Sequence, residues 1–462
     1  MRTLVTALVG LSLFVPPSLA GQAELEPTLS RPGGVTLLYR ALPGSRVFAA
    51  RVYLLGGPSV AGATQAGIEP LVLRVAASGS RLYPGRESEA RVSRLGAGTF
   101  VSAGSDWTVY GVEGLAENFN ELWRVFADRM VNPELPEAAL DLERERASTL
   151  RRASSDDPES QAHALAVTRA FEDHPYRLPP RGWESSLAEL TVDDLRAYQE
   201  RHVVKSRLLV VVVGGVSRDE VIGAVEATLG SLPEGNFEWV PPPAWAADST
   251  TITVEERPLA TNYIRGVFGG PLTSAKEYPA FELATIILSN FVERGARSAG
   301  ISYAAGVVPM DRAASGGYYH VSTRAPGQAI RGLNRIISSL SQVIFNRSDI
   351  RQAANNSERV YFELNETPGQ QADVIARAYL LRGRLESLDS FLDELHSVDP
   401  VDLRRVVRRY FRNFQWAYVG DTDLLPAEAM RLYCDECTEP GGDREPVKSG
   451  VRRKPEVETP GH

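Results

Sequence analysis

The sequence predicts an α+β protein made of two homologous halves, each a mixed or antiparallel sheet covered by helices. The chain has 462 residues, of which 43% are hydrophobic and 23% charged, so it is long enough for two or three globular domains. Strand-like and helix-like segments recur in the same order at an interval of roughly 210 residues. A proline-rich stretch separates the two series.

Similar strands open the two halves. Val47–Leu55 alternates apolar and polar residues and is followed by Gly56–Pro58, while Tyr263–Phe268 is a similar run followed by Gly269–Pro271. Because both runs lead into the same Gly-Gly-Pro sequence, we interpret them as copies of one strand.

Helices follow in each half, and a further strand closes it. Apolar residues at helical spacing predict one helix that ends near Asn132 and another that ends near Asn346. The first set is Leu115, Phe119, Leu122, Trp123, Phe126 and Met130; the second is Leu333, Ile336, Ile337, Leu340, Val343 and Ile344. Leu208–Val213 and Gln415–Val419 are the predicted closing strands. The alternative is two unrelated α+β domains.

The repeat gives the domain boundaries. We place an N-terminal domain at 25–235 and a C-terminal domain at 251–432. The linker at 236–250 carries three consecutive prolines, Pro241–Pro243, which stiffen the chain. Residues 438–462 are rich in proline, glycine and charge, which predicts a disordered tail.

The N-terminus predicts export. Residues 1–20 combine an early arginine, a short apolar run and a small-residue end, which is typical of a signal peptide cleaved after Ala20. The alternative is a buried N-terminal helix. No later stretch has about 20 uncharged apolar residues, so we expect a periplasmic or secreted protein with no membrane span.

Composition excludes some kinds of site. The net charge is -8, from 50 Lys+Arg and 58 Asp+Glu, which argues against a nucleic-acid partner. Only six histidines and two cysteines are present, so metal ligands are scarce. Cys434 and Cys437 form a C-x-x-C that would close a local disulfide in an exported chain. A thiol enzyme using this pair is the alternative, but the motif lacks the βαβ context of redox-active thiols.

Several short motifs occur in a particular order. They are Gly67–Ile68, Asp156–Pro158, His174–Tyr176, Leu190–Leu195 and Val212–Gly214. Together with the tandem repeat, they resemble peptidase family M16, the pitrilysin/insulinase metallopeptidases, and within it the processing-peptidase type. The resemblance implies two α+β halves, of the fold of the mitochondrial processing peptidases, that enclose a cavity.

The resemblance also locates a zinc motif that this chain lacks. In active members, the helix after Gly-Ile carries H-x-x-E-H, which supplies two zinc ligands and the general base. Here Pro70 and Arg74 stand at the histidine positions and Leu73 at the general base, while the third ligand falls near Leu150. Proline and leucine donate nothing and arginine repels a cation, so we expect no zinc in this chain and no activity of the chain alone.

A second set of residues resembles the substrate-binding part of two-subunit members. There, an arginine and a tyrosine on the segment after the first helix of the second half hold the substrate backbone. Gly300–Tyr303 matches the end of that pattern, and Arg297 is the matching arginine, six rather than seven residues before Tyr303. Arg294 is the alternative arginine. Both side-chain types donate hydrogen bonds to an oxygen that gains charge.

The leading hypothesis is therefore a non-catalytic subunit of an exported heterodimeric zinc peptidase. A paralogue that carries H-x-x-E-H would hold the zinc, and this chain would add cavity wall and the Arg297/Tyr303 pair. Peptides or unfolded polypeptide segments would be the substrates. The alternative is a catalytically inert scaffold or peptide-binding protein of the same fold.

Overall fold

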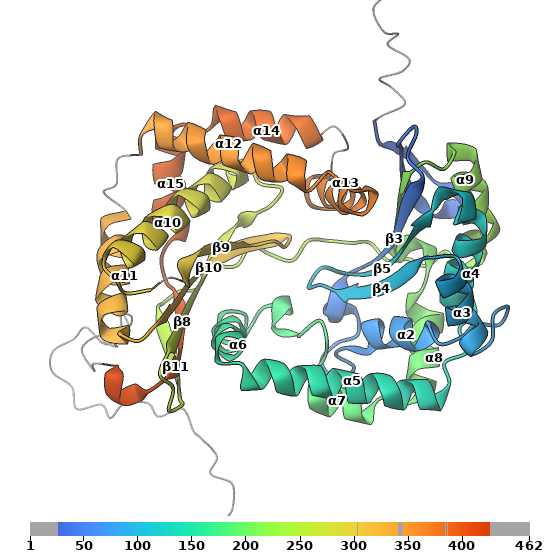
Figure 1. Cartoon of the computed structure of the whole chain (residues 1–462), viewed down its shortest axis with the longest axis horizontal. Helices are drawn as coiled ribbons and strands as arrows, with labels where there is room; N and C mark the ends of the chain where they lie inside the picture. Colours follow the sequence, from blue (N-terminus) through green and yellow to red (C-terminus); the bar gives the residue numbers. More distant parts are fainter. Residues whose placement is uncertain (1–25, 303, 341–344, 384, 386, 426–462) are drawn as a thin grey trace, which may run out of the picture.

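The computed structural model describes residues 26–302, 304–340, 345–383, 385 and 387–425 (Figure 1). Tyr303, the predicted signal peptide at 1–20, the Cys434/Cys437 pair and the predicted tail at 438–462 lie outside these residues.

The first sheet has six strands in the order β1-β2-β6-β3-β5-β4. Only β2 and β6 run parallel to each other, and all other neighbours are antiparallel. The strands are β1 Thr28–Ser30, β2 Thr36–Ala41, β3 Val47–Leu55, β4 Gly98–Ala103, β5 Trp107–Leu115 and β6 Leu208–Gly214.

The second sheet has five strands in the order β7-β11-β8-β10-β9, and again a single parallel pair, β7 with β11. The strands are β7 Thr251–Glu256, β8 Asn262–Leu272, β9 Ala304–Met310, β10 Ala314–Thr323 and β11 Gln415–Gly420. Position by position, this order repeats β2-β6-β3-β5-β4. The predicted α+β fold with two mixed sheets is confirmed.

In each half, helices connect the strands and cover the sheet. The N-terminal half has α2 Ile68–Ala76, α3 Arg86–Arg94, α4 Phe119–Val131, α5 Glu137–Asp156, α6 Pro158–Ala170, α7 Glu184–Glu189, α8 Val192–His202 and α9 Arg218–Ala227. The C-terminal half has α10 Tyr278–Ser298, α11 Pro326–Leu340, α12 Arg347–Glu363, α13 Pro368–Arg382, α14 Ser387–Ser397 and α15 Pro400–Tyr410. No helix of the described chain is long and apolar enough to cross a bilayer.

Matching caps start the equivalent helices α8 and α15. Thr191 accepts a hydrogen bond from the Asp194 amide, and the Asp194 side chain caps the Thr191 amide in return. Asp399 and Asp402 form the same reciprocal pair at α15. These capping boxes satisfy amides that have no partner inside the helix, which fixes where each helix begins.

Two predicted element boundaries were wrong. Leu115 is the last residue of β5, and the helix begins at Phe119. Strand β8 does not stop at Phe268 but continues through Gly269–Pro271, because Gly269 lies opposite Gly316 of β10. The first Gly-Gly-Pro, Gly56–Pro58, lies outside β3 as predicted, since Gly56 has φ 103° and a 3-10 helix follows.

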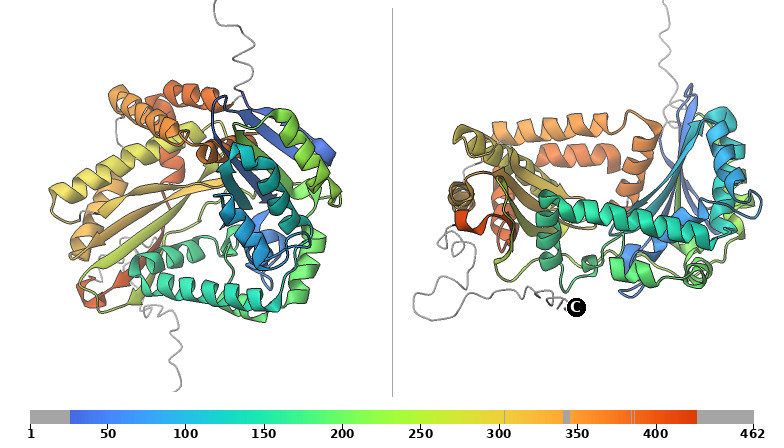
Figure 2. Two further views of the ribbon diagram at one scale, coloured as in Figure 1. Left: turned by 45° about the vertical axis from the view of Figure 1, so that its right-hand side comes forward. Right: turned by 60° about the horizontal axis from the view of Figure 1, so that its bottom comes forward.

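Each half covers one face of the other half's sheet. Helices α4 and α9 pack on one face of the first sheet, with α10, α11 and α15 on the corresponding face of the second. The remaining faces, called inner faces here, receive a helix from the opposite half: α13 lies on β3 and β6, and α6 lies on β8 and β11 (Figures 1 and 2).

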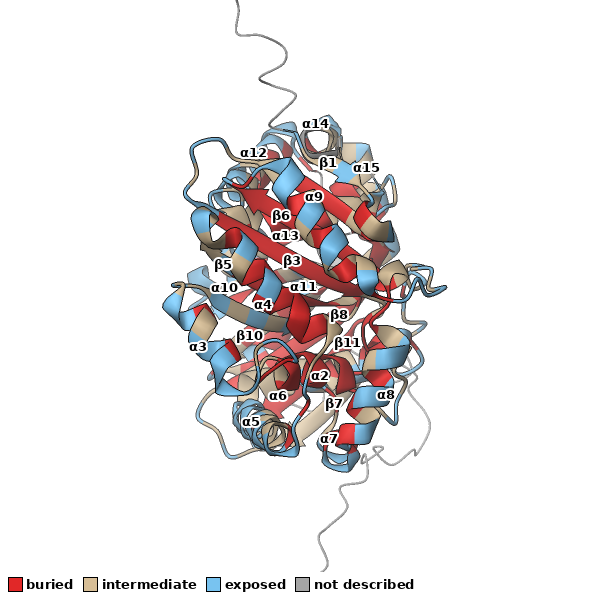
Figure 3. Cartoon of the chain, turned by 90° about the vertical axis from the view of Figure 1, so that its right-hand side faces the viewer, coloured by how far each residue is buried: buried red, intermediate tan, exposed pale blue. Residues whose placement is uncertain are grey.

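The long helices α5 and α12 lead into these exchanged helices from opposite sides of the molecule (Figure 2). Figure 3 shows the N-terminal half from outside, with β3 buried and α3 and much of α5 exposed. The two halves therefore share their cores rather than meet at a flat boundary.

A buried polar contact also joins the halves. The Tyr176 hydroxyl donates to Asp106 at 2.7 Å, and the other Asp106 oxygen accepts the Ala313 amide at 2.9 Å. The Ala314 amide donates to the Tyr176 oxygen at 3.1 Å. Burial raises the pKa of Asp106, an effect that these donors oppose. His174 accepts the Tyr176 amide, so the His174–Tyr176 motif serves this junction.

Candidate functional site

The candidate site begins at helix α2, which carries the positions of the missing zinc motif. Its N-cap residue Gly67 has φ 88°, a conformation that favours glycine. A Cβ at Gly67 would lie 2.7 Å from the Cα of Gly182 and 2.8 Å from the Arg181 carbonyl oxygen. The Gly67–Ile68 motif thus allows α2 to start against a second glycine-containing loop.

A buried ion pair anchors α2. Glu69 is 3% exposed, and its Oε2 accepts hydrogen bonds from Arg207 Nη2 and from the Tyr198 hydroxyl, both at 2.7 Å. Arg207 also donates to the Leu55 carbonyl at the end of β3. Such a pair strongly penalises loss of either partner, because the other charge would be left buried and alone. The helix is therefore held in place although its catalytic residues are absent.

The missing-motif positions fall into three environments. Pro70 is buried, and Leu73 joins the core between α2 and the first sheet. Leu150, on α5, is 55% exposed. Arg74 is half-buried.

Arg74 lies near one acidic and one basic side chain. Burial lowers its pKa, Glu143 of α5 opposes this, and Arg181 lowers it further. Glu143 is itself paired with Arg146 at 2.5 Å. Arginine keeps its proton at ordinary pH even when its pKa is lowered, so a cation stands where the resemblance would place a metal ligand.

The side chains at this position do not fit zinc. Catalytic zinc needs three nitrogen, sulfur or oxygen ligands from the protein. Of the three ligand positions, Pro70 and Leu150 offer no such side-chain atom, and Arg74 carries a positive charge. Nowhere in the described part of the chain do three or more His, Cys, Asp or Glu side chains gather closely enough to hold a metal ion.

The predicted substrate-binding arginine lies on a helix, not on the segment after it. Helix α10 runs to Ser298 and so includes both Arg294 and Arg297. Arg297 is 58% exposed and pairs with Glu293 one turn earlier, at 2.6 Å. Arg294 lies over the Phe291 ring at 5.2 Å. Figure 1 shows α10 and α2 in opposite halves, on either side of the sheets. The structure therefore does not bring Arg297 to Arg74.

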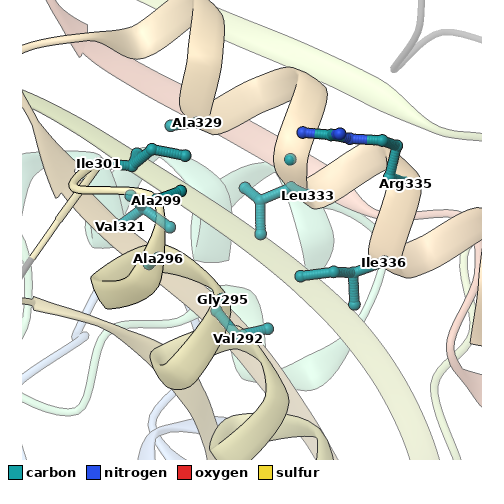
Figure 4. Close-up of a pocket in the computed structure, with 11 residues that line it drawn as sticks. Val292, Gly295, Ala296, Ala299, Ile301, Val321, Ala329, Leu333, Arg335 and Ile336 are labelled. Atoms are coloured by element: carbon teal, nitrogen blue, oxygen red, sulfur yellow. The ribbon is translucent and has the colours of Figure 1, made fainter.

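An apolar pocket of about 350 Å³ lies between the end of α10, the helix that carries Arg297, and α11 (Figure 4). It is lined by Val292, Gly295, Ala296, Ala299, Ile301, Val321, Ala329, Gly332, Leu333, Arg335 and Ile336. The small residues of α10 and α11 leave this space open, and Arg335 is its one charged lining residue. The pocket suits an apolar side chain.

Sequence reasoning missed one polar cluster altogether. His163 of α6 and Tyr318 and His320 of β10 gather around the buried Arg265 of β8. These residues are far apart in the sequence, and no motif links them. The alternation along β10 places Tyr318 and His320 on one face, but only the exchange of α6 between the halves brings His163 to them.

A family model agrees with this fold. Residues 189–305 match the model described as Peptidase M16 inactive domain. An uncharacterized zinc protease of Mycobacterium leprae is 24% identical over 200 residues, 43% of this chain and 45% of the relative. Cytochrome b-c1 complex subunit 1 of Mus musculus is 24% identical over 160 residues, 34% of this chain and 33% of that protein. The chain thus spans less than half the length of these curated relatives.

Solved structures match over most of the chain. A peptidase M16 inactive domain from Pseudomonas fluorescens has a TM-score of 0.78 at 16% identity, over 86% of this chain and 98% of that one. A chain of Complex III2 from Candida albicans has a TM-score of 0.73 at 17% identity, over 88% of this chain and 99% of that one. These likenesses establish the shared fold.

Proposed function

We propose that this chain, a homologue of the M16 peptidases, is the non-catalytic subunit of an exported heterodimeric zinc peptidase. The observation that carries the proposal is the state of α2. The helix is anchored by the Glu69–Arg207 pair, while Pro70, Leu73 and Arg74 occupy the positions of the zinc ligands and the general base. The structural frame of the site is kept and its chemistry is not.

The catalytic groups would come from a partner. A paralogue with an intact H-x-x-E-H would hold the zinc and supply the general base. This chain would add cavity wall, Arg297 and Tyr303, two donors for the oxygen that becomes negative during peptide-bond attack. The exposed position of Arg297, in the half that does not contain α2, favours a role toward another chain.

The pocket at the end of α10 supports a peptide substrate. An extended peptide whose backbone contacts Arg297 would place an apolar side chain in the pocket of about 350 Å³ between α10 and α11. Peptides or unfolded segments are the proposed substrates. Export rests on the predicted signal peptide at 1–20.

Reconstitution tests this proposal. The full mature chain is purified alone and with an exported H-x-x-E-H paralogue, and zinc content and cleavage of an unfolded protein such as casein are measured. We expect no stoichiometric zinc and no cleavage by the chain alone, and both in the complex. Zinc-dependent cleavage by the isolated chain would contradict the proposal.

Variants of the complex test the two donors. Arg297→Gln and Tyr303→Phe should each lower kcat/KM about 10- to 100-fold without weakening assembly, because each removes one donor. Arg196→Gln is the matched control, since Arg196 is also an exposed arginine with an acid one turn away. If Arg294→Gln is damaging and Arg297→Gln is not, the role passes to Arg294.

A catalytically inert scaffold is the second candidate. Arg297 already has an ion-pair partner in Glu293, and the matched relatives include a cytochrome b-c1 complex subunit. A scaffold predicts that every assembly of this chain is inactive and that Arg297→Gln changes nothing measurable.

A further inference from the structure

The inner face of the second sheet carries four side chains with unused hydrogen-bonding groups. We call Arg265, His163, Tyr318 and His320 the donor cluster. Arg265 and His320 lie directly opposite each other on the antiparallel strands β8 and β10, so both point to the same face. Tyr318 is two residues before His320 and shares that face.

Helix α6 completes the donor cluster from the other half of the molecule. His163 follows Glu159 by one helical turn, so both face the same side of α6. The His163 and Tyr318 rings are 4.7 Å apart, and the Arg265 guanidinium carbon is 5.6 Å from the Tyr318 ring centre. Arg265 Nη2 forms an ion pair with Glu159.

The donors of this cluster are largely unused. Arg265 is 4% exposed, yet its Nε and Nη1 groups have no hydrogen-bond partner among the residues the structure describes. Within the same residues, no hydrogen bond engages the His163 or His320 ring or the Tyr318 hydroxyl. A buried donor without a partner is destabilising, so a group that accepts from Arg265 would be favoured here.

The charge of the cluster favours an anion over a metal. Burial, with Arg265 and Arg312, lowers the pKa of His163 to about 4. Burial and Arg265 also lower the pKa of His320, against the opposing effect of Glu159 and Glu293. Both rings are therefore neutral at pH 7 and each offers one N–H. The guanidinium would repel a metal cation.

The first sheet has a comparable arginine whose charge is balanced by two carboxylates, although its Nε also has no hydrogen-bond partner among the described residues. Arg51 of β3 also lies buried on an inner face, but it pairs with Glu113 and lies 3.5 Å from Asp373 of α13. Arg265 pairs with one carboxylate, that of Glu159, which is 47% exposed. The second inner face thus lacks one negative charge that the first possesses.

We propose that the donor cluster is a binding subsite for a carboxylate of a peptide, either its C-terminus or an acidic side chain. Arg265 would supply the charge and two N–H groups, and His163, His320 and Tyr318 would supply neutral donors. His163, Tyr318 and His320 are partly buried, whereas Arg265 Nε and Nη1 are covered, so a carboxylate would reach Arg265 by displacing these rings. This binding needs no second subunit, so it is independent of the proposed peptidase activity.

Three labelled peptides test the subsite on the isolated full mature chain. They share a Gly/Ser/Ala sequence with an N-terminal fluorophore: one has a free C-terminus, one an amidated C-terminus, and one is amidated with a single internal Glu. We expect the free-acid peptide, the Glu peptide or both to bind at least 10-fold more tightly than the neutral amide by fluorescence anisotropy. The pattern distinguishes a terminal from a side-chain carboxylate.

Variants assign the effect to the cluster. Arg265→Gln and His320→Phe should remove the preference for a carboxylate, whereas Arg405→Gln, at an exposed ion pair on α15, should preserve it. His163→Phe, which keeps a ring against Tyr318, covers the case in which Arg265→Gln fails to fold. Equal affinity for the three peptides, no binding at millimolar protein, or a preference that survives in every foldable cluster variant would overturn the proposal. None of these results would affect the heterodimer test.

Discussion

The two halves share one strand order but treat buried charge differently. In the N-terminal half, Glu69 is paired with Arg207, and Arg51 lies between two carboxylates. In the C-terminal half, Arg265 has a single, half-exposed acid and two unused N–H groups. The two halves share an architecture, whereas the pairing of their buried charges differs. A buried charge that has its counter-charge stabilises a helix or a sheet. A buried charge with unused hydrogen-bond donors offers a place for a ligand.

The largest expected effect is the loss of the N-terminal anchor. Replacing Glu69 by Gln should lower the free energy of unfolding by about 3–5 kcal/mol, because Arg207 is left buried without its counter-charge. Urea unfolding followed by circular dichroism measures this. Glu363→Gln is the control in the C-terminal half and should cost about 1 kcal/mol or less, since both partners of the Glu363–Arg359 pair are exposed. Equal costs would break the contrast between the halves.

A pH effect should arise at His163, where α6 covers the inner face of the second sheet. The folded-state pKa of His163 is about 4, below the ordinary value of 6.5. Between these two pH values the unfolded chain therefore binds a proton at His163 that the folded chain does not bind. Stability from this residue is therefore complete above pH 6.5 and is lost as the pH falls from 6.5 to 4. The loss is about 3 kcal/mol at most.

His163→Phe isolates this contribution. Urea midpoints of the wild type and the variant are measured between pH 4 and 7.5. The wild type should lose stability relative to the variant as the pH falls, because only the wild type takes up the His163 proton on unfolding. A difference that does not change with pH would mean that His163 titrates normally in the folded protein.

The smallest effect compares the two inner-face arginines. Arg51→Met should destabilise by about 1–3 kcal/mol, because Glu113 and Asp373 lose a buried partner. Arg265→Met should change stability by less than about 1 kcal/mol, because it also removes two unsatisfied N–H groups. A thermal-shift measurement of both variants ranks them. The reverse order would show that Arg265 is the more structural of the two.

The sequence predicted what depends on local pattern. Strands such as Val47–Leu55 and helices capped at Thr191 and Asp399 are specified by apolar spacing and short-range hydrogen bonds. The end of β8 was not predictable in this way, because its continuation depends on pairing with β10. The position of Arg297 on α10 was missed because the family pattern placed it after the helix.

The candidate-site residues also divide into those that a local pattern indicates and those that long-range packing brings together. The positions of the missing zinc motif were assigned from spacing relative to Gly67–Ile68 in the family pattern, and that assignment stays a prediction. The donor cluster could not, because His163 and His320 are brought together only when α6 crosses to the opposite sheet. No local sequence pattern predicts that a helix packs on the sheet of the other half.

The exchange of α6 and α13 has a consequence for biosynthesis. The apolar inner face of the first sheet, with Leu209, Val211 and Tyr53, is covered by a helix that is translated only after residue 367. Until then the growing chain has a sheet face without its cover, so the first half cannot finish folding on the ribosome ahead of the second. Separately expressed halves should accordingly be aggregation-prone alone and soluble when produced together, each completing the other as a split protein does.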